Sequence, residues 1–196
     1  MVNKIKNNSK NLILDSALDV FVKKGYAETR MEDIVKLSGL SKGAIYYHYN
    51  SKRDLFLSLI EHWENYSFPD IFNKDLEKNT SSEILRQIVK DIVNTFKTNK
   101  KVFLAELEFW SLANHDSEVR DKTKQLYVKL LKLFKNIIDN GIKNNEFKKI
   151  NLDIGSLSIM TSIQGIIWFS IFEESKLSAE EYLNEVMEFI INGFKK

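Results

Sequence analysis

The residues with the clearest chemical potential lie in one short stretch, between Thr29 and Lys52, which reads TRMEDIVKLSGLSKGAIYYHYNSK. Hydroxyl groups and backbone amides at the start of a helix suit phosphate oxygens. A lysine binds a phosphate or a guanine edge, and a tyrosine binds a phosphate or a thymine methyl group. Ser41, Lys42 and Tyr47 supply these groups within seven residues, so the stretch predicts contacts to DNA.

Two short helices are expected to position these groups, one over about 30–37 and one over about 41–48. Thr29 with Glu32 has the form of a capping box for the first helix. Ser41 opens the second helix, and Gly39 permits a tight turn between the two. Gly43 removes a side chain at the start of the second helix, which would let the backbone approach DNA closely.

The apolar residues of this stretch complete a helix-turn-helix pattern. Ile34, Val35 and Leu37 are expected to pack on a preceding helix, and Leu40 and Ile45 to fill the gap between the two short helices. In such a motif the second helix enters the major groove.

The rest of the chain also reads as helix, because apolar residues recur every three or four positions and strand-like alternation is missing. The 196 residues include a single proline. The fold class expected is all-α, with an N-terminal DNA-binding domain over 8–68, whose motif spans about 30–50, and a larger C-terminal domain over 69–196. About nine helices are predicted, over 9–24, 30–37, 41–48, 51–66, 82–97, 101–113, 117–143, 152–173 and 179–194.

Charge is unevenly divided along the chain, although the formal net charge is only +2. Residues 1–53 hold ten Lys and Arg against five Asp and Glu, which gives +5, and the remainder is −3. A basic first quarter favours an anion-binding module. The start of the chain lacks a secretory signal pattern and the apolar stretch 154–172 is too polar for a membrane span, so we expect a cytoplasmic protein without a membrane partner.

Enzymatic chemistry finds little support. The chain has no cysteine, which excludes disulfides and thiolate sites, and its three histidines lack metal-ligand spacing. GxSxG, HExxH, P-loop and GxGxxG motifs are all missing. We therefore expect no catalytic residue, no metal and no cofactor, and a small helical enzyme is the least favoured alternative.

The C-terminal three quarters offer candidates for an apolar ligand pocket with a few polar groups for orientation. Each aromatic among them is also a candidate for the hydrophobic core. The candidates are Trp63, Tyr66, Phe103, Glu106, Leu107, Trp110, Tyr127, Met160, Gln164 and Trp168.

The last two predicted helices suggest self-association. The helix over 152–173 is apolar on more than one face, so that one face can meet the core and another a partner. Gly165 would allow a close helix approach, and Ser178 with Glu181 forms a capping box before the final helix. The predicted dimer contacts are Ile163, Ile167, Ile171, Tyr182, Val186, Phe189 and Ile190.

Residues 8–68 resemble the DNA-binding domain of the TetR family of bacterial repressors. The shared pattern runs through Gly25-Tyr26, Thr29, Ile34, Gly39 to Gly43, Ile45 to Tyr49 and Ser51 to Leu55. It departs from the family at Tyr49, where phenylalanine is usual, and at Asp54, where glutamate is usual. By position, the resemblance implies DNA contacts at Thr29, Arg30, Ser41, Lys42, Gly43, Ala44, Tyr46, Tyr47, His48 and Lys52.

The resemblance also implies a homodimer with a ligand-binding C-terminal domain. The segment from Glu106 to Tyr127 is similar to the effector domains of some betaine-operon and fatty-acid-responsive repressors. The favoured function is a repressor that binds a palindromic operator as a dimer and is released by a small apolar or amphipathic effector. The alternative within the same class is a DNA-binding regulator without an effector, and the fourth predicted helix is the expected link between pocket and DNA reader.

Overall fold

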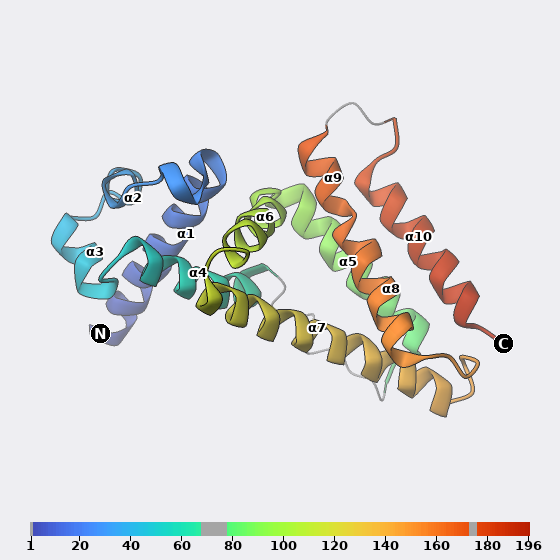
Figure 1. Cartoon of the computed structure of the whole chain (residues 1–196). Coiled ribbons are helices and arrows are strands. Elements are labelled where there is room, and N and C mark those ends of the chain that lie inside the picture. The colour runs from blue at the N-terminus through green and yellow to red at the C-terminus, as the bar shows by residue number, and fades with distance from the viewer. Residues whose placement is uncertain (1, 68–77, 173–175) are drawn as a thin grey trace. The chain divides into compact units, whose positions relative to one another are not determined.

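A computed structural model describes the backbone of residues 2–67, 78–172 and 176–196, and the side chains of residues 9–63, 78–172 and 176–196. Over these residues the fold is all-α, as predicted, and only an isolated bridge between Phe147 and Lys195 has β character. Its helices (Figure 1) are α1 (Val2–Glu28), α2 (Met31–Ser38), α3 (Lys42–His48), α4 (Lys52–Ser67), α5 (Ser81–Thr98), α6 (Lys101–Ala113), α7 (Ser117–Lys143), α8 (Leu152–Gln164), α9 (Ile166–Ile171) and α10 (Ala179–Phe194).

Two glycines explain where the helices depart from continuity. Gly25 has a φ of 78° and a ψ of 157°, which kinks α1 at the position predicted to end it. Gly165 marks the boundary between α8 and α9 within the span predicted as one helix, and its φ of −54° and ψ of −20° stay in the right-handed helical region. A Cβ at Gly165 would lie 2.4 Å from the Tyr182 hydroxyl oxygen. The close approach that Gly165 permits is therefore to α10 of the same chain.

The helices form two compact units. The first comprises Met1–Tyr66 with Leu104–Lys124, and the second comprises Ser67–Phe103 with Gln125–Lys196. The predicted domains, over 8–68 and 69–196, differ from these units chiefly because residues 104–124 belong with the N-terminal residues. Helix α7 begins in the first unit and continues in the second.

The first unit is built around a cluster of aromatic rings. The Phe56 ring of α4 meets the Phe21 ring edge-on at 5.2 Å between centroids and the Phe109 ring of α6 at 5.6 Å. Trp63 adds a third edge-on contact, to Phe109 at 5.9 Å. Each such pair contributes about 0.5–1.5 kcal/mol beyond its buried area. This cluster fixes α4 between α1 and α6.

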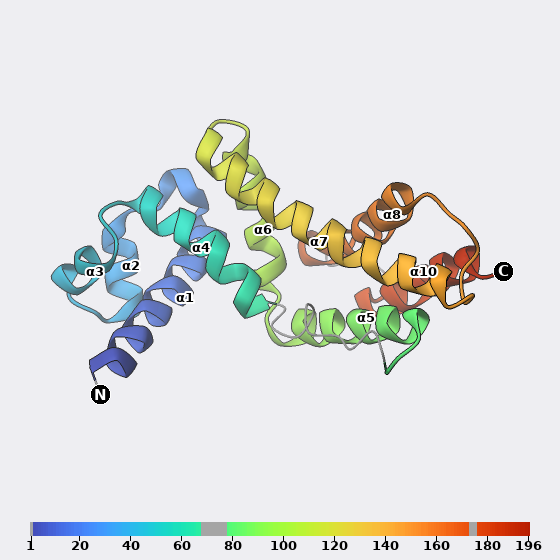
Figure 2. The ribbon, with the colours of Figure 1, turned by 90° about the horizontal axis from the view of Figure 1, so that it is seen from below.

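The second unit places α5 along α10 (Figure 2). Apolar side chains on both helices are fully buried, among them Leu85 and Ile88 of α5. Ion pairs flank this seam, from Arg86 to Glu188 and from Lys97 to Glu180. Thr80 caps the start of α5, because its hydroxyl oxygen accepts a hydrogen bond from Glu83 N. The helix therefore begins at Ser81, one residue before the predicted position.

Candidate nucleic-acid interface

The turn between α2 and α3 has the geometry that the sequence predicts. Gly39 ends α2 with φ 68° and ψ 6°, a left-handed conformation that costs glycine little. Ser41 then caps α3, because its hydroxyl oxygen accepts a hydrogen bond from Ala44 N at 3.1 Å. The end of α2 and the start of α3 thus lie where the local sequence predicts them.

The cap of α2 differs from the prediction. The N-cap residue is Arg30, whose backbone N–H donates to the Asp33 carboxylate at 2.9 Å. The predicted pair of Thr29 and Glu32 is therefore wrong by one residue. Thr29 is only 2% exposed, and its hydroxyl donates to the Gly25 carbonyl. That burial excludes the Thr29 side chain as a DNA contact in this arrangement. The hydrogen bond to Gly25 links the kink in α1 to the start of α2.

Burial of Ile34 and Ile45 holds the motif together, as expected from their spacing. Tyr49 lies behind α3 and is also buried. Leu37 behaves differently, since it is 53% exposed and does not pack on the preceding helix as predicted.

The outer face of α3 is polar and open to solvent. Tyr47 is 71% exposed, the most open of the large side chains on this helix. The remaining predicted contacts of this face are exposed or half-buried, namely Ser41, Lys42, Gly43, Ala44, Tyr46 and His48, and Arg30 is exposed at the start of α2. Among these predicted residues only Ala44 and His48 are half-buried, and the others are exposed.

Lys42 has a carboxylate partner on α2. Its Nζ lies 2.8 Å from Glu32 Oε1, and both side chains are exposed. The hydrogen bond from Lys42 lowers the pKa of Glu32, and the same bond raises the pKa of Lys42. Lys42 is positively charged at neutral pH with or without this pair, so a phosphate would have to compete with the Glu32 carboxylate for it.

Lys52 is engaged within the protein. Its Nζ donates to the carbonyl oxygens of Tyr26 at 2.6 Å and Ala27 at 3.1 Å, and it lies 4.4 Å from the centre of the Tyr26 ring. In this structure Lys52 bonds the start of α4 to the end of α1, and its phosphate contact stays a prediction.

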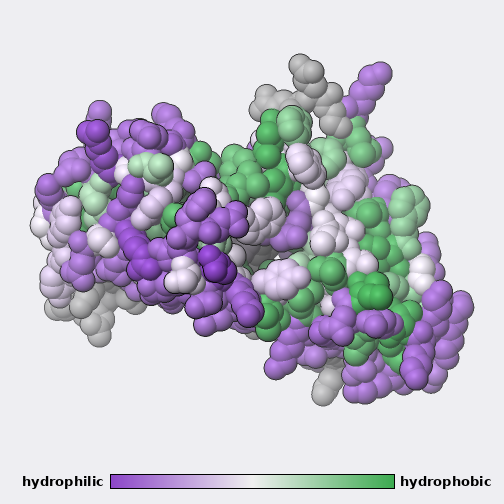
Figure 3. All heavy atoms as spheres, in the orientation of Figure 1, coloured by the Kyte–Doolittle hydropathy of each residue, from purple (hydrophilic) through white to green (hydrophobic). Residues whose placement is uncertain are grey.

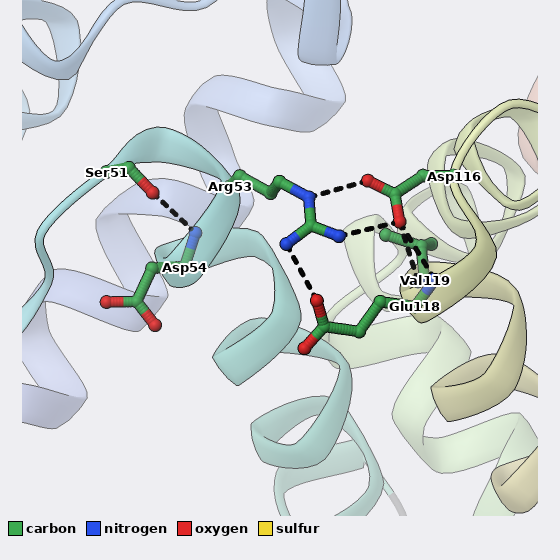
Figure 4. A network of polar contacts seen from close by, with 6 residues as sticks. All are labelled: Ser51, Arg53, Asp54, Asp116, Glu118 and Val119. Atoms are coloured by element: carbon green, nitrogen blue, oxygen red, sulfur yellow. Dashed lines mark hydrogen bonds and ion pairs between the residues drawn. The ribbon is translucent and has the colours of Figure 1, made fainter.

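Arg53 forms a contact that the sequence did not reveal (Figure 4). Its guanidinium donates two hydrogen bonds to Asp116, at 2.7 and 2.9 Å, and one to Glu118 at 2.7 Å. The bonds from Arg53 lower the pKa of Asp116 to about 2. The partners lie more than sixty residues along the chain, and no local spacing signals such a pair.

The predicted ligand-pocket residues divide between the two units. Trp63, Glu106, Leu107 and Trp110 belong to the first, and Phe103, Tyr127, Met160, Gln164 and Trp168 to the second. Trp63, Phe103 and Met160 are buried, whereas Trp168 is 62% exposed and stacks on Phe172. The Tyr66 side chain lies outside the described residues. A separate surface cavity of about 440 Å³ is lined by Asn79, Glu83, Ile84, Arg86, Gln87 and Lys90 and includes none of these candidates.

The predicted dimer residues also vary in exposure. Phe189 is 70% exposed and Ile171 is exposed, whereas Ile163, Tyr182, Val186 and Ile190 are half-buried. Ile167 is buried within its own chain, which corrects its assignment to a dimer surface. The segment Leu152–Ile171 is long and apolar enough to cross a membrane by length and composition, and one third of it is buried. Figure 3 shows apolar atoms gathered on the surface formed by α8 and α9.

Among the residues that the structure describes, no group of three or more His, Asp or Glu residues could hold a metal ion. Two short helices with a left-handed turn and an exposed polar recognition face define a helix-turn-helix DNA-binding protein. That class agrees with comparisons to known proteins. Residues 13–59 match the bacterial regulatory proteins of the tetR family, and residues 64–196 match the C-terminal region of QacR-like proteins. The chain belongs to the TetR family of transcriptional regulators.

Individual relatives agree with this assignment. The transcriptional regulator QacR of Staphylococcus aureus is 25% identical over 96% of this chain and 100% of its own length. The negative transcriptional regulator IcaR of the biofilm operon icaADBC in Staphylococcus epidermidis is 34% identical over 41% of this chain and 43% of its own length. The fold resembles that of the transcriptional regulator FadR of Bacillus subtilis, solved in complex with stearoyl-CoA, with a TM-score of 0.78, 22% identity, and coverage of 93% of this chain and 98% of that one.

Proposed function

We propose that this regulator is a cytoplasmic homodimeric repressor that binds a palindromic operator and is released by a small apolar or amphipathic effector. The observation that supports it most is the exposed polar face of α3, which presents Ser41, Lys42 and Tyr47 beside a capped helix start. Backbone amides, a hydroxyl and an ammonium on one face are the groups that bind phosphates and base edges in a major groove.

DNA contact is proposed for the predicted residues that remain accessible on α3 and at the start of α2. These are Arg30, Ser41, Lys42, Gly43, Ala44, Tyr46, Tyr47 and His48. The +5 charge of residues 1–53 supplies the attraction to the backbone. In a dimer, two α3 helices would read half-sites separated by about one helical turn of DNA, roughly 34–36 Å.

Repression and effector release rest on the relatives. The name of IcaR describes a negative regulator, and the solved FadR contains stearoyl-CoA, an amphipathic molecule with a long acyl chain. The effector must bind the DNA-released state more tightly than the operator-bound state, or it shifts nothing. Within the second unit, the buried apolar side chains Phe103 and Met160 are the predicted residues with the chemistry to contact an acyl chain.

Self-association is proposed through α8, α9 and α10. Ile154 and Leu157 are exposed on α8, as are Trp168 on α9 and Phe189 on α10. Such apolar side chains are costly to leave in water, and each buried CH₂ group stabilises association by about 0.8 kcal/mol. This surface replaces Ile167 in the predicted set, because Ile167 already faces its own core.

The DNA assignment is tested by selecting bound duplexes from a random library and titrating the selected operator. Lys42→Ala and Tyr47→Ala are expected to weaken binding by about 1–3 kcal/mol each if they contact bases, and less if they contact phosphates only. Lys23→Ala is the matched control, because Lys23 is an exposed lysine on α1 outside the motif. Unchanged operator affinity in both motif variants refutes the assignment of α3 as the reader.

Dimer formation and effector binding require separate measurements. Light scattering after gel filtration is expected to give twice the 22.9 kDa chain mass, and Phe189→Glu to reduce it toward the monomer. Stearoyl-CoA, a free fatty acid and choline are then added to the protein–operator complex. Release by the acyl compounds supports the effector class. A complex that none of them releases, together with no thermal shift of the free protein, favours a regulator without an effector.

A further inference from the structure

The start of α4 is anchored to the turn between α6 and α7 by three charge-assisted hydrogen bonds. Arg53 donates two bonds to Asp116 and one to Glu118 (Figure 4). The paired geometry with Asp116 matches the planar guanidinium to the planar carboxylate, which fixes direction as well as distance. All three residues belong to the first unit.

The Asp116 carboxylate is also held by hydrogen bonds that do not involve Arg53. Asp116 Oδ1 accepts hydrogen bonds from Glu118 N at 3.0 Å and Val119 N at 3.1 Å, so the carboxylate caps the N-terminus of α7. Only 19% of its side chain is exposed, compared with 52% for Glu118. A fixed acceptor requires less ordering when Arg53 binds, and the anchor is correspondingly specific in geometry.

A second set of hydrogen bonds lies next to the anchor and holds the chain just before α2. Lys52, adjacent to Arg53, binds the carbonyls of Tyr26 and Ala27, just before α2 begins. The Tyr26 backbone N–H in turn donates to Glu108 of α6 at 2.9 Å. The segment 28–49, which contains α2 and α3, is therefore held at both ends by contacts that lead to α6 and to the start of α7.

We infer that Arg53 is a positioning residue for DNA binding, which sets the orientation of α2 and α3 through Asp116 and Glu118. The inference rests on the proposed DNA-reading role of α3. Because Arg53 is paired with carboxylates, it acts through the first turn of α4, and its guanidinium is withheld from phosphate. Loss of the anchor leaves the reader folded but less ordered, and ordering it again on DNA reduces affinity.

This assignment predicts the sign of the effect of removing the carboxylate. If Arg53 were a phosphate contact restrained by Asp116, then Asp116→Asn would free the guanidinium and strengthen DNA binding. If Arg53 positions the reader, Asp116→Asn weakens binding although a negative charge has been removed. Asparagine is a good N-cap residue, so the substitution preserves the start of α7.

The experiment is a double-mutant cycle of Arg53→Gln and Asp116→Asn, read as affinity for the selected operator and for an unrelated duplex. The matched control is Asp121→Asn, which removes one exposed negative charge from the early part of α7. We expect each single variant to lose operator affinity by about fivefold or more, and the double variant to be no weaker than Arg53→Gln. Circular dichroism at the binding temperature verifies that every variant is folded, and binding to the unrelated duplex is expected to change less.

The contrary outcomes are distinct. Operator affinity that rises in Asp116→Asn beyond the Asp121→Asn control, or that is unchanged, overturns the positioning role. Strictly additive losses also overturn it, because they would mean that the two residues act separately. Failure of the unmodified protein to select any duplex would instead refute the proposed DNA-binding function, so the two failures cannot be confused.

Discussion

Gly141, near the end of α7, tests the packing of the second unit most directly. A Cβ built there would lie 2.3 Å from Cδ2 of Phe147, 2.7 Å from Cε2 and 3.0 Å from Cγ. Carbon atoms in contact are normally about 3.5–4.0 Å apart, so the ring would have to move by more than about 1 Å. Gly141→Ala therefore requires Phe147 to leave its position.

Phe147 has little freedom to move. Its side chain is 1% exposed, its ring meets Phe194 edge-on at 5.7 Å, and its backbone N–H donates to the Gly141 carbonyl at 3.0 Å. Overpacking of this kind costs about 1–3 kcal/mol, whereas alanine gains at most about 1 kcal/mol over glycine inside a helix. Packing should win, and we expect Gly141→Ala to lower the free energy of unfolding by about 1–2 kcal/mol.

The matched control is Gly193→Ala in α10, because no heavy atom lies within 4 Å of a Cβ at that glycine. Both glycines are helical, so the difference between the two variants isolates the packing effect. The assay is urea unfolding followed by circular dichroism at one fixed protein concentration, since self-association would make stability depend on concentration. The reasoning is refuted if Gly141→Ala is as stable as Gly193→Ala.

Three further substitutions probe other sites. Tyr49→Phe should stabilise the first unit by about 1 kcal/mol in urea unfolding, because the buried Tyr49 hydroxyl has no hydrogen-bond partner in the described structure; a loss of stability would reveal a partner. Gly165→Ala should destabilise the second unit, and less so in a Tyr182→Phe background, because the new Cβ would meet the Tyr182 hydroxyl at 2.4 Å; equal losses in both backgrounds would contradict this. Asp116 has a pKa lowered to about 2, against about 3.9 when unfolded, so its stabilising effect is complete above about pH 4 and is lost toward pH 2. In urea unfolding, the stability difference between wild type and Asp116→Asn should therefore become smaller as the pH falls from about 4 to about 2. A difference that stays constant would exclude the ion pair as its source.

Local chemistry made most of the fold predictable. The positive φ values of Gly25 and Gly39 and the capping by Ser41 and Ser178 depend on residues within a few positions of each other. Helix positions follow from apolar periodicity for the same reason. The boundary at Gly165 is different, because there Tyr182 approaches from α10 and its hydroxyl donates to the Ser162 carbonyl.

The candidate site was likewise predictable where it depends on residues close together in the sequence. The exposed face of α3 follows from helical spacing, and Tyr47 lies on it as expected. Arg53 could have paired with any of many acids, and only the fold brings Asp116 to it. Thr29 is buried, and Lys52 donates to the Tyr26 and Ala27 carbonyls. Both contacts depend on the tertiary structure, and the spacing of residues in the sequence does not predict them.

The unequal surroundings of the three tryptophans provide built-in spectroscopic reporters. Trp63 is buried in the first unit, Trp110 is partly open, and Trp168 of α9 is largely in water and stacked on Phe172. Indole emission moves to shorter wavelength when water is excluded. Dilution of the unlabelled protein should therefore shift its emission to longer wavelength if Trp168 is covered by a second copy, and a variant retaining Trp168 alone would follow assembly without any attached dye.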